Sequence, residues 1–295
     1  MKMHDGEAEL DAGLVGRLVA TQFPDLAGLP VSEVRSTGTV NAIYQLGEQF
    51  YARLPLVPRF VRALEREWRW LPELAPRLSL RIPEPVGLGQ PAAGYPSIWA
   101  VYRWLDGCPY SDQLVDDERH AARDLARFVT ELRRIPPAAD APAAGRRPLA
   151  ELDADTRTSI AAAADVIDAR AAVAAWEHAR QAPAWDGQPR WIHSDLLRPN
   201  LLVAAGRLRA VIDFGSVGVG DPATDVIPAW AVFGPAGRRA FRAALDVDEA
   251  TWARARGIAL HQAAALVPYY AVSNPAFAEL GRRTVAEVVA DLRAD

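Results

Sequence analysis

The sequence contains very little lysine and very little cysteine. Lys2 is the only lysine among 33 basic residues, so arginine supplies the rest of the positive charge. An interior site that needs a cation must therefore use arginine, whose planar guanidinium stays charged at any working pH. Cys108 is the only cysteine, which excludes an intrachain disulfide and a cluster of thiolate ligands. This usage is typical of a reducing compartment, so we expect a cytoplasmic protein whose single thiol is buried or idle.

Basic runs and long apolar runs are also missing. The formal net charge is -4 and no basic run exceeds two arginines, so we expect no nucleic-acid partner. The first residues lack the apolar core of a signal peptide, and residues 258–272 are too short to span a bilayer. A chain of 295 residues that is 50% hydrophobic is expected to be globular, without a membrane partner. The sequence leaves the oligomeric state open.

The first hundred or so residues predict a small mixed lobe. Leucines recur at helical spacing from Leu10 to Leu18, and a second helix is expected over residues 60–74. The β-rich or alternating runs predict strands over residues 31–36, 40–46, 49–54, 83–88 and 97–104. The break at Leu105-Asp106-Gly107 indicates a hinge, so we expect one domain over residues 1–104 and a second over 105–295.

The remainder of the sequence is mainly helical in pattern. Helices are expected over residues 112–134 and 159–179, and four more after Asp221-Pro222. Between them, Trp191-Ile192 indicates a strand, and two further apolar runs form a hairpin across residues 204–207. The predicted fold class is therefore α+β.

The strongest motif is His193-Ser194-Asp195, followed by Asn200 and then by Asp213-Phe214-Gly215. The spacing H-x-D-L-x-x-x-N, then D-F-G, is that of a kinase catalytic loop and metal-binding strand. Phosphoryl transfer requires an oriented acceptor hydroxyl and Mg²⁺ on the phosphates. Asp195 is the candidate catalytic residue for the first task, and Asn200 and Asp213 are candidate metal ligands for the second.

These motifs, together with Gly220-Asp221-Pro222-Ala223-Thr224-Asp225 and the loop of residues 36–41, resemble the aminoglycoside phosphotransferase family of small-molecule kinases. That family also includes macrolide phosphotransferases. The resemblance spans nearly the whole chain. It implies a protein-kinase-like bilobal fold, with a small N-terminal mixed β-sheet lobe, a larger helical C-terminal lobe and the nucleotide between them. It also implies ATP, or GTP as the alternative, and Mg²⁺.

Two departures from the family pattern affect the site. The usual glycine between the histidine and the catalytic aspartate is Ser194, which changes loop geometry but removes no functional group. The lysine expected on the third strand is absent, and by position Arg53 is the substitute. By the resemblance, Arg53 pairs with Glu67 on the following helix, with Glu65 as the alternative, and contacts the nucleotide phosphates. Arg53 as an ordinary surface residue is the competing interpretation.

Several other residues have both structural and functional interpretations. Gly38 lies in a turn that covers phosphates or is a plain hairpin turn. His193 is expected to support the loop, and Asp221 and Asp225 to act as scaffold at a helix start. Arg198, between Asp195 and Asn200, contacts either the transferred phosphoryl group or only solvent.

The acceptor is a hydroxylated small molecule whose identity the sequence leaves open. After Asp225 the chain has seven acidic residues and eight arginines, so this part offers no acidic surplus for a polycationic aminoglycoside. Aromatic residues there suit a macrolide or another metabolite, although aromatics at helical spacing usually lie in a core.

A protein kinase is disfavoured because no A-P-E follows the D-F-G. The non-enzymatic alternative is a pseudokinase that binds nucleotide without transferring a phosphoryl group.

Overall fold

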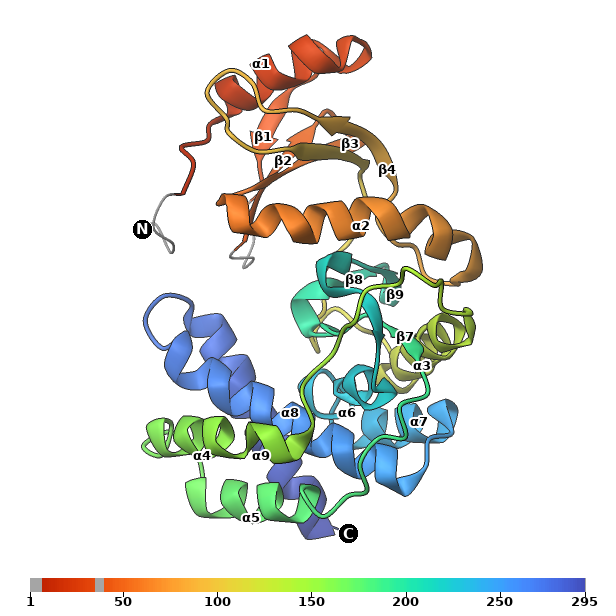
Figure 1. Cartoon of the computed structure of the whole chain (residues 1–295), viewed down its shortest axis with the longest axis vertical. Helices are drawn as coiled ribbons and strands as arrows, with labels where there is room; N and C mark the ends of the chain where they lie inside the picture. The colour runs from red at the N-terminus through yellow and green to blue at the C-terminus, as the bar shows by residue number, and fades with distance from the viewer. Residues whose placement is uncertain (1–6, 35–39, 295) are drawn as a thin grey trace. The chain divides into compact units, whose positions relative to one another are not determined.

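The structure is a computed structural model that describes residues 7–34 and 40–294. The chain divides into two compact units, drawn with their elements in Figure 1. The first comprises Met1–Pro76, Arg81–Asp106 and Val211–Ser216, and the second comprises Arg77–Leu80, Gly107–Ala210 and Val217–Asp295. The Asp213-Phe214-Gly215 segment therefore packs within the first unit, although it follows most of the second in sequence.

The first unit contains a five-stranded antiparallel sheet in the order β1-β2-β3-β5-β4. Its strands are β1 (Val31–Glu33), β2 (Asn41–Leu46), β3 (Phe50–Pro55), β4 (Pro85–Gly89) and β5 (Trp99–Arg103). The turn between β2 and β3 places Gly47 at a φ of +58°, a conformation that glycine adopts without strain. The register pairs Ile43 with Arg53 and Arg53 with Ala100, so Arg53 lies on a central strand of the sheet.

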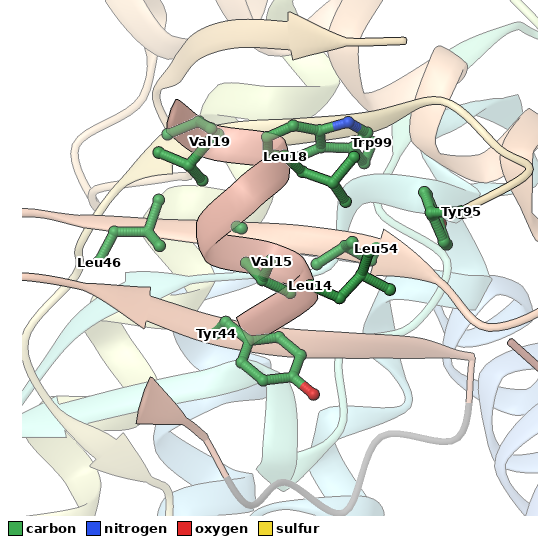
Figure 2. Close-up of a cluster of buried hydrophobic side chains, with 11 residues drawn as sticks. Leu14, Val15, Leu18, Val19, Tyr44, Leu46, Leu54, Tyr95 and Trp99 are labelled. Carbon is green, nitrogen blue, oxygen red and sulfur yellow. The ribbon is translucent and has the colours of Figure 1, made fainter. Parts of the chain in front are cut away.

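Helix α1 (Ala12–Gln22) covers one face of this sheet. Its N-cap is Asp11, whose carboxylate accepts a 2.6 Å hydrogen bond from the N–H of Leu14. The helix buries Leu14, Val15, Leu18 and Val19, which pack with strand residues that include Tyr44, Leu54 and Trp99 (Figure 2). Burial of each such side chain contributes about 1.5–3 kcal/mol of transfer free energy, so this cluster forms the core on that side of the sheet.

Helix α2 (Val61–Leu74) buries an unusual combination of residues. Leu64, Leu71 and Leu74 follow the three- and four-residue spacing of an apolar face, and Glu67 occupies a position on the same face. Glu67 is fully buried. A buried carboxylate requires a positively charged partner, because the cost of desolvating it alone is too high.

The second unit is mainly helical. Its helices are α3 (Glu118–Arg134), α4 (Asp153–Ala162), α5 (Ala169–Ala179), α6 (Pro228–Ala231), α7 (Pro235–Leu245), α8 (Glu249–Tyr269) and α9 (Pro275–Ala294). Two small antiparallel pairings accompany them: β7 (Arg190–Ile192) with β10 (Gly218–Gly220), and a sheet of β6 (Cys108–Pro109), β8 (Leu201–Ala204) and β9 (Arg207–Val211). Cys108 is exposed. The hairpin turn between β8 and β9 gives Ala205 and Gly206 positive φ values, as a two-residue turn of twisted strands requires.

The prediction of one helix over residues 159–179 is wrong. The segment forms the end of α4 and all of α5, separated by a turn over residues 163–168. Asp168 caps α5 by accepting a 3.0 Å hydrogen bond from the N–H of Ala171. An aspartate that can cap thus starts a new helix inside an alanine-rich stretch. The helix predicted from residue 112 begins only at Glu118, behind the N-cap Asp117.

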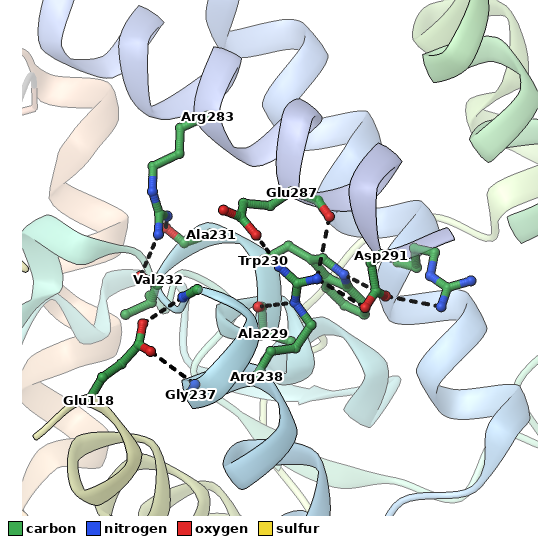
Figure 3. Close-up of polar contacts among 12 residues, drawn as sticks. Glu118, Ala229, Trp230, Ala231, Val232, Gly237, Arg238, Arg283, Glu287 and Asp291 are labelled. Atoms are coloured by element: carbon green, nitrogen blue, oxygen red, sulfur yellow. Dashed lines mark hydrogen bonds and ion pairs between the residues drawn. The ribbon is translucent and has the colours of Figure 1, made fainter. Parts of the chain in front are cut away.

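A buried ionic network joins three helices of the second unit (Figure 3). Arg238 of α7 donates to the Ala229 carbonyl at 2.9 Å and pairs with Asp291 of α9 at 2.9 Å and with Glu287. Trp230 of α6 donates its indole N–H to Asp291 at 3.0 Å. Arg238 is 5% exposed, so its positive charge and its N–H donors need the partners that these contacts supply.

The predicted α+β class is confirmed, with an N-terminal antiparallel sheet and a helical C-terminal part. The four helical stretches expected after Asp221-Pro222 are α6 to α9. No helix in the described part of the chain is long and apolar enough to cross a membrane.

Candidate active site

Arg53, Glu67 and Asp213 form an ion cluster in the first unit. The guanidinium of Arg53 lies 2.5 Å from Oε2 of Glu67 and 2.8 Å from Oδ1 of Asp213. With its side-chain amide turned so that the oxygen faces Arg53, Asn41 accepts from Nε at 3.1 Å and from Nη2 at 3.0 Å. The sequence therefore predicts the ion pair correctly, and it predicts the right glutamate, because Glu65 is exposed on the other face of α2.

This cluster holds one positive and two negative charges, and its members differ in exposure. The side chains of Arg53 and Glu67 are 6% and 0% exposed, whereas that of Asp213 is 38% exposed. Burial raises the pKa of Glu67 to about 7, and the charge of Asp213 acts in the same direction while Arg53 opposes it. An additional cation beside Asp213 would balance the cluster. The net charge of -1 and the partly exposed carboxylate of Asp213 thus suit a nearby cation.

Asp213 occupies a strained backbone conformation. Its φ is +65°, which costs roughly 1–2 kcal/mol for a residue with a side chain. The following Gly215 lies against α2, where an added Cβ would come 3.0 Å from the Cβ of Ala63. Strain of this kind persists only where the surroundings hold it, and it is common at functional sites. Because Gly215 has no side chain, the turn after Asp213 can pack closely against α2.

The catalytic-loop motif lies in the second unit, directly after β7. Fully buried Asp225 accepts hydrogen bonds from the N–H groups of His193 at 2.7 Å and Ser194 at 2.8 Å. Burial raises the pKa of Asp225, and His193 and these N–H groups act against the shift. The ring of His193 accepts from the N–H of Asp195 at 3.2 Å, with the proton thereby assigned to the other ring nitrogen. Both residues support the loop, as the sequence predicts.

Ser194 explains why glycine is usual at this position. Its φ is +74°, in the left-handed region that favours glycine. The side chain is buried, and its hydroxyl has no hydrogen-bond partner among the residues that the structure describes. The substitution therefore retains the loop conformation and carries an energetic cost.

The carboxylate of Asp195 faces two side-chain amides. Asn200 donates its NH₂ group to Oδ2 of Asp195 at 2.9 Å and to the Asp195 carbonyl at 2.8 Å. These two bonds commit the nitrogen of the Asn200 amide and leave its carbonyl oxygen as the atom suited to a metal ion. Gln262 of α8 places its NH₂ group 3.5 Å from Oδ1 of Asp195. No sequence signal singled out Gln262, which is 67 residues away in the chain.

Arg198 makes several contacts within the protein and does not face solvent alone. Its guanidinium pairs with Asp112 at 2.6 Å and donates to the Val232 carbonyl at 2.7 Å and 3.1 Å. It also lies over the ring of Tyr110 at 5.3 Å. Arg198 therefore joins the segment after β6 to the segment before α7, and its contact with the transferred phosphoryl group stays a prediction.

Asp221 has the predicted scaffold role. Its side chain caps the turn Pro222–Val226 by accepting from the N–H of Ala223 at 2.9 Å, and it pairs with Arg254 at 2.9 Å. Gly38 lies outside the described residues. The structure thus brings Arg53, Glu67 and Asp213 together in one unit and Asp195 and Asn200 together in the other.

A sequence model described as the phosphotransferase enzyme family, APH, matches residues 33–258 of the chain. That range contains Arg53, Glu67, Asp195, Asn200 and Asp213. The chain belongs to the phosphotransferase enzyme family. The comparison with curated proteins gives no match.

Solved structures of other phosphotransferases share the fold. The GDP and kanamycin complex of APH(2")-IIIa has a TM-score of 0.73 at 19% identity, over 94% of this chain and 98% of that one. The streptomycin–ATP ternary complex of APH(2")-IIa has a TM-score of 0.60 at 19% identity, over 87% and 88%. The macrolide 2'-phosphotransferase MphH from Brachybacterium faecium has a TM-score of 0.62 at 22% identity, over 93% and 97%.

Membership in the phosphotransferase family makes this chain an enzyme that transfers phosphoryl groups. The described residues contain no group of three or more His, Cys, Asp or Glu side chains placed to hold a metal ion. Magnesium at a phosphotransferase site needs only one or two protein ligands, because substrate phosphates and water complete its shell. Two protein ligands therefore suffice for this chemistry.

Proposed function

We propose that this protein is a cytoplasmic, ATP-dependent O-phosphotransferase that moves the γ-phosphoryl group to a hydroxyl of a small molecule. The observation that carries the proposal is the Asp195 carboxylate, held by the Asn200 amide at 2.9 Å and by a loop anchored on buried Asp225. A carboxylate fixed in this way can orient an acceptor hydroxyl and accept its proton. Structural relatives in complex with ATP and with GDP support a nucleotide, with GTP as the alternative donor.

Asp213 and Asn200 are the proposed Mg²⁺ ligands. The two negative charges around Arg53, and the Asn200 oxygen left by its two NH₂ hydrogen bonds, both fit a hard cation. When bound, Mg²⁺ neutralises charge on the transferring phosphoryl group. Arg53 supplies the fixed positive charge for the nucleotide phosphates, because it cannot lose its proton and no lysine is available in the interior.

Phosphoryl transfer passes through a loose transition state, so the protein contributes mainly position and charge. Asp195 is therefore expected to act by holding the acceptor oxygen in line as well as by taking its proton. Structural relatives in complex with kanamycin and with streptomycin, and a macrolide 2'-phosphotransferase, support an acceptor of the hydroxylated antibiotic or metabolite type.

Single-turnover kinetics on the wild type and on Asp195→Asn test this function. The amide keeps the shape of the side chain, so nucleotide binding is expected to stay intact while transfer falls by about 10²- to 10⁴-fold. A matched control is Asp186→Asn, at an exposed aspartate of a loop. A loss below about threefold would remove Asp195 from the mechanism. Tight nucleotide binding by the wild type, with no transfer to any acceptor, would support the pseudokinase alternative instead.

A further inference from the structure

A surface pocket of the second unit lies on helix α3, where α3 packs against α7. Its volume is about 390 Å³, which is within the size range of small-molecule sites. Five residues of α3 and one of α7 line it: Arg123, Arg127, Thr130, Glu131, Arg134 and Ala244. None of the candidate active-site residues is among them. The pocket is therefore a separate site.

The five α3 residues of the pocket share one face of the helix. They occupy positions i, i+4, i+7, i+8 and i+11, which lie above one another on a helix surface. Leu125 and Phe128, which point to the other side of α3, are fully buried. Arg123, Arg127 and Arg134 are exposed. The pocket thus lies on the solvent side of α3 and presents three guanidinium groups.

These three arginines have no polar partner in the described part of the chain. None of them makes a hydrogen bond or an ion pair with another residue that the structure describes. Arg133, in contrast, donates to the Pro222 carbonyl at 2.6 Å. Arg123 and Arg127 lie one turn apart in the middle of α3, where two like charges destabilise a helix by about 0.2–0.5 kcal/mol and are too far from its end to gain from the helix dipole. The stability of α3 therefore gives no reason for this pair.

Two acidic residues lie between positions 123 and 134, and both bond to other groups. Glu131, the one acid that lines the pocket, accepts a 2.7 Å hydrogen bond from the N–H of Ser79. Asp124 is 8% exposed and pairs with Arg207 at 3.2 Å. The lining residues carry three positive charges and one negative charge, so the net charge of the pocket is +2.

The spacing of the arginines suits two anionic groups. Arg123 and Arg127 are about 6 Å apart along the helix axis, so both can bind one oxyanion. Arg134 lies about 10 Å beyond Arg127 along the axis and is placed for a second group. A guanidinium binds carboxylate and phosphate oxygens through two parallel hydrogen bonds. Thr130 donates its hydroxyl to the Ala126 carbonyl at 2.8 Å, so the arginines supply the free donors of the pocket.

We propose that this pocket, termed the α3 arginine pocket, binds an elongated small molecule that has a phosphate or carboxylate group at each end. Arg123 and Arg127 bind one end, and Arg134 binds the other. Ala244 and the aliphatic stems of the arginines contact the carbon chain between the two groups. This binding does not depend on the proposed phosphoryl transfer.

Calorimetry on the full chain tests the proposal. The two-ended probes are hexane-1,6-diyl bisphosphate and suberate, and hexyl phosphate and octanoate are their one-ended counterparts. Salt at about 150 mM screens attraction that has no fixed geometry, and MgADP in excess occupies the proposed nucleotide site. Arg127→Gln and Arg134→Gln each remove one cation from the pocket. Arg170→Gln, at an exposed arginine of α5, is the matched control.

We expect the wild type to bind one of the two-ended probes with a Kd below about 1 mM and at least about tenfold more tightly than its one-ended counterpart. The tighter of the two shows whether the ends are phosphates or carboxylates. Arg134→Gln should remove the preference for two ends, because the second group loses its partner. Arg127→Gln should weaken binding of the two-ended probe about tenfold, and Arg170→Gln should leave it unchanged.

Three results would overturn the proposal. The first is that neither two-ended probe binds. The second is that Arg170→Gln weakens binding as much as Arg127→Gln does, which would indicate attraction to the whole surface. The third is that Arg134→Gln keeps the full preference for two ends. All three substituted residues are exposed, so the variants are expected to fold, and thermal unfolding checks this.

Discussion

The N–H of Ser194 donates a 2.8 Å hydrogen bond to Oδ1 of Asp225 while Ser194 itself holds a φ of +74°. The loop that contains Asp195 is thus hydrogen-bonded to the buried carboxylate of Asp225 through Ser194, whose backbone conformation suits glycine. The hydrogen bonds to Asp225 stabilise the folded loop, whereas the backbone conformation of Ser194 destabilises it. Substitutions at the two residues are therefore expected to change the free energy of unfolding in opposite directions.

Ser194→Gly is expected to raise the free energy of unfolding by about 1 kcal/mol. The left-handed conformation costs a residue with a side chain about 1–2 kcal/mol, and the buried hydroxyl without a partner adds to this cost. The greater chain entropy of glycine offsets about 0.5–1 kcal/mol. Urea unfolding measures the difference, with Ala205→Gly as the control at another positive φ. A fall in stability would mean that the serine contributes contacts outweighing its strain.

Asp225→Ala is expected to lower the free energy of unfolding by about 3 kcal/mol. The change leaves the N–H groups of His193 and Ser194 buried without an acceptor. Asp225→Asn keeps one acceptor oxygen and should cost less. Thermal unfolding and turnover are to be measured together, because the loop that holds Asp195 depends on both bonds. Unchanged stability in Asp225→Ala would contradict the bracing role.

Arg53→Ala is expected to raise the Michaelis constant for the nucleotide and to lower turnover. Glu67→Ala should show a milder form of the same defect, and the double variant should be less than additive because the two side chains form one ion pair. Arg53→Lys should recover only part of the activity, since an ammonium cannot span Glu67, Asp213 and Asn41 together. Arg62→Ala, exposed on α2, is the control. Wild-type kinetics in Arg53→Ala would show that another group binds the nucleotide phosphates.

The pH dependence of stability is expected to report on Glu67. Burial raises its pKa from 4.5 to about 7 in the folded protein, so the folded state holds this proton more tightly than the unfolded state does. The contribution of Glu67 to the free energy of unfolding therefore falls as the pH rises between these two values. Glu67→Gln removes the titration, and the difference between variant and wild type should grow over that interval. Measurements without nucleotide or metal test this, with exposed Glu65→Gln as the control, and a constant difference would contradict it.

Asp213→Ala should weaken magnesium-dependent nucleotide binding more than Asn200→Ala does. A carboxylate is the stronger ligand for a hard cation, and Asn200 supplies a neutral oxygen. Calorimetry with MgATP and with ATP plus EDTA separates the metal-dependent part. Asp213→Ala also removes one charge from the Arg53 cluster, so binding of ATP with EDTA is measured for both variants. Unchanged magnesium dependence in Asp213→Ala would remove it from the proposed ligands.

Local spacing in the sequence determined much of the site. Asp195 and Asn200 lie five residues apart in one loop, so the motif predicts directly that they lie close together, and Asn200 donates to the Asp195 carboxylate at 2.9 Å. The scarcity of lysine and the family resemblance together predicted Arg53 as the interior cation, with Glu67 as the favoured partner and Glu65 as the alternative, and the structure decides for Glu67 because it lies on the buried face of α2.

Tertiary structure alone decided the contacts between distant segments. Arg53 meets Asp213 across 160 residues, Gln262 reaches Asp195 across 67, and Asp225 binds the N–H of His193 across 32. No local preference encodes such pairs, because they depend on how sheets and helices pack. The alanine-rich segment divided into α4 and α5 for a related reason, since a capping aspartate outweighed high helix propensity.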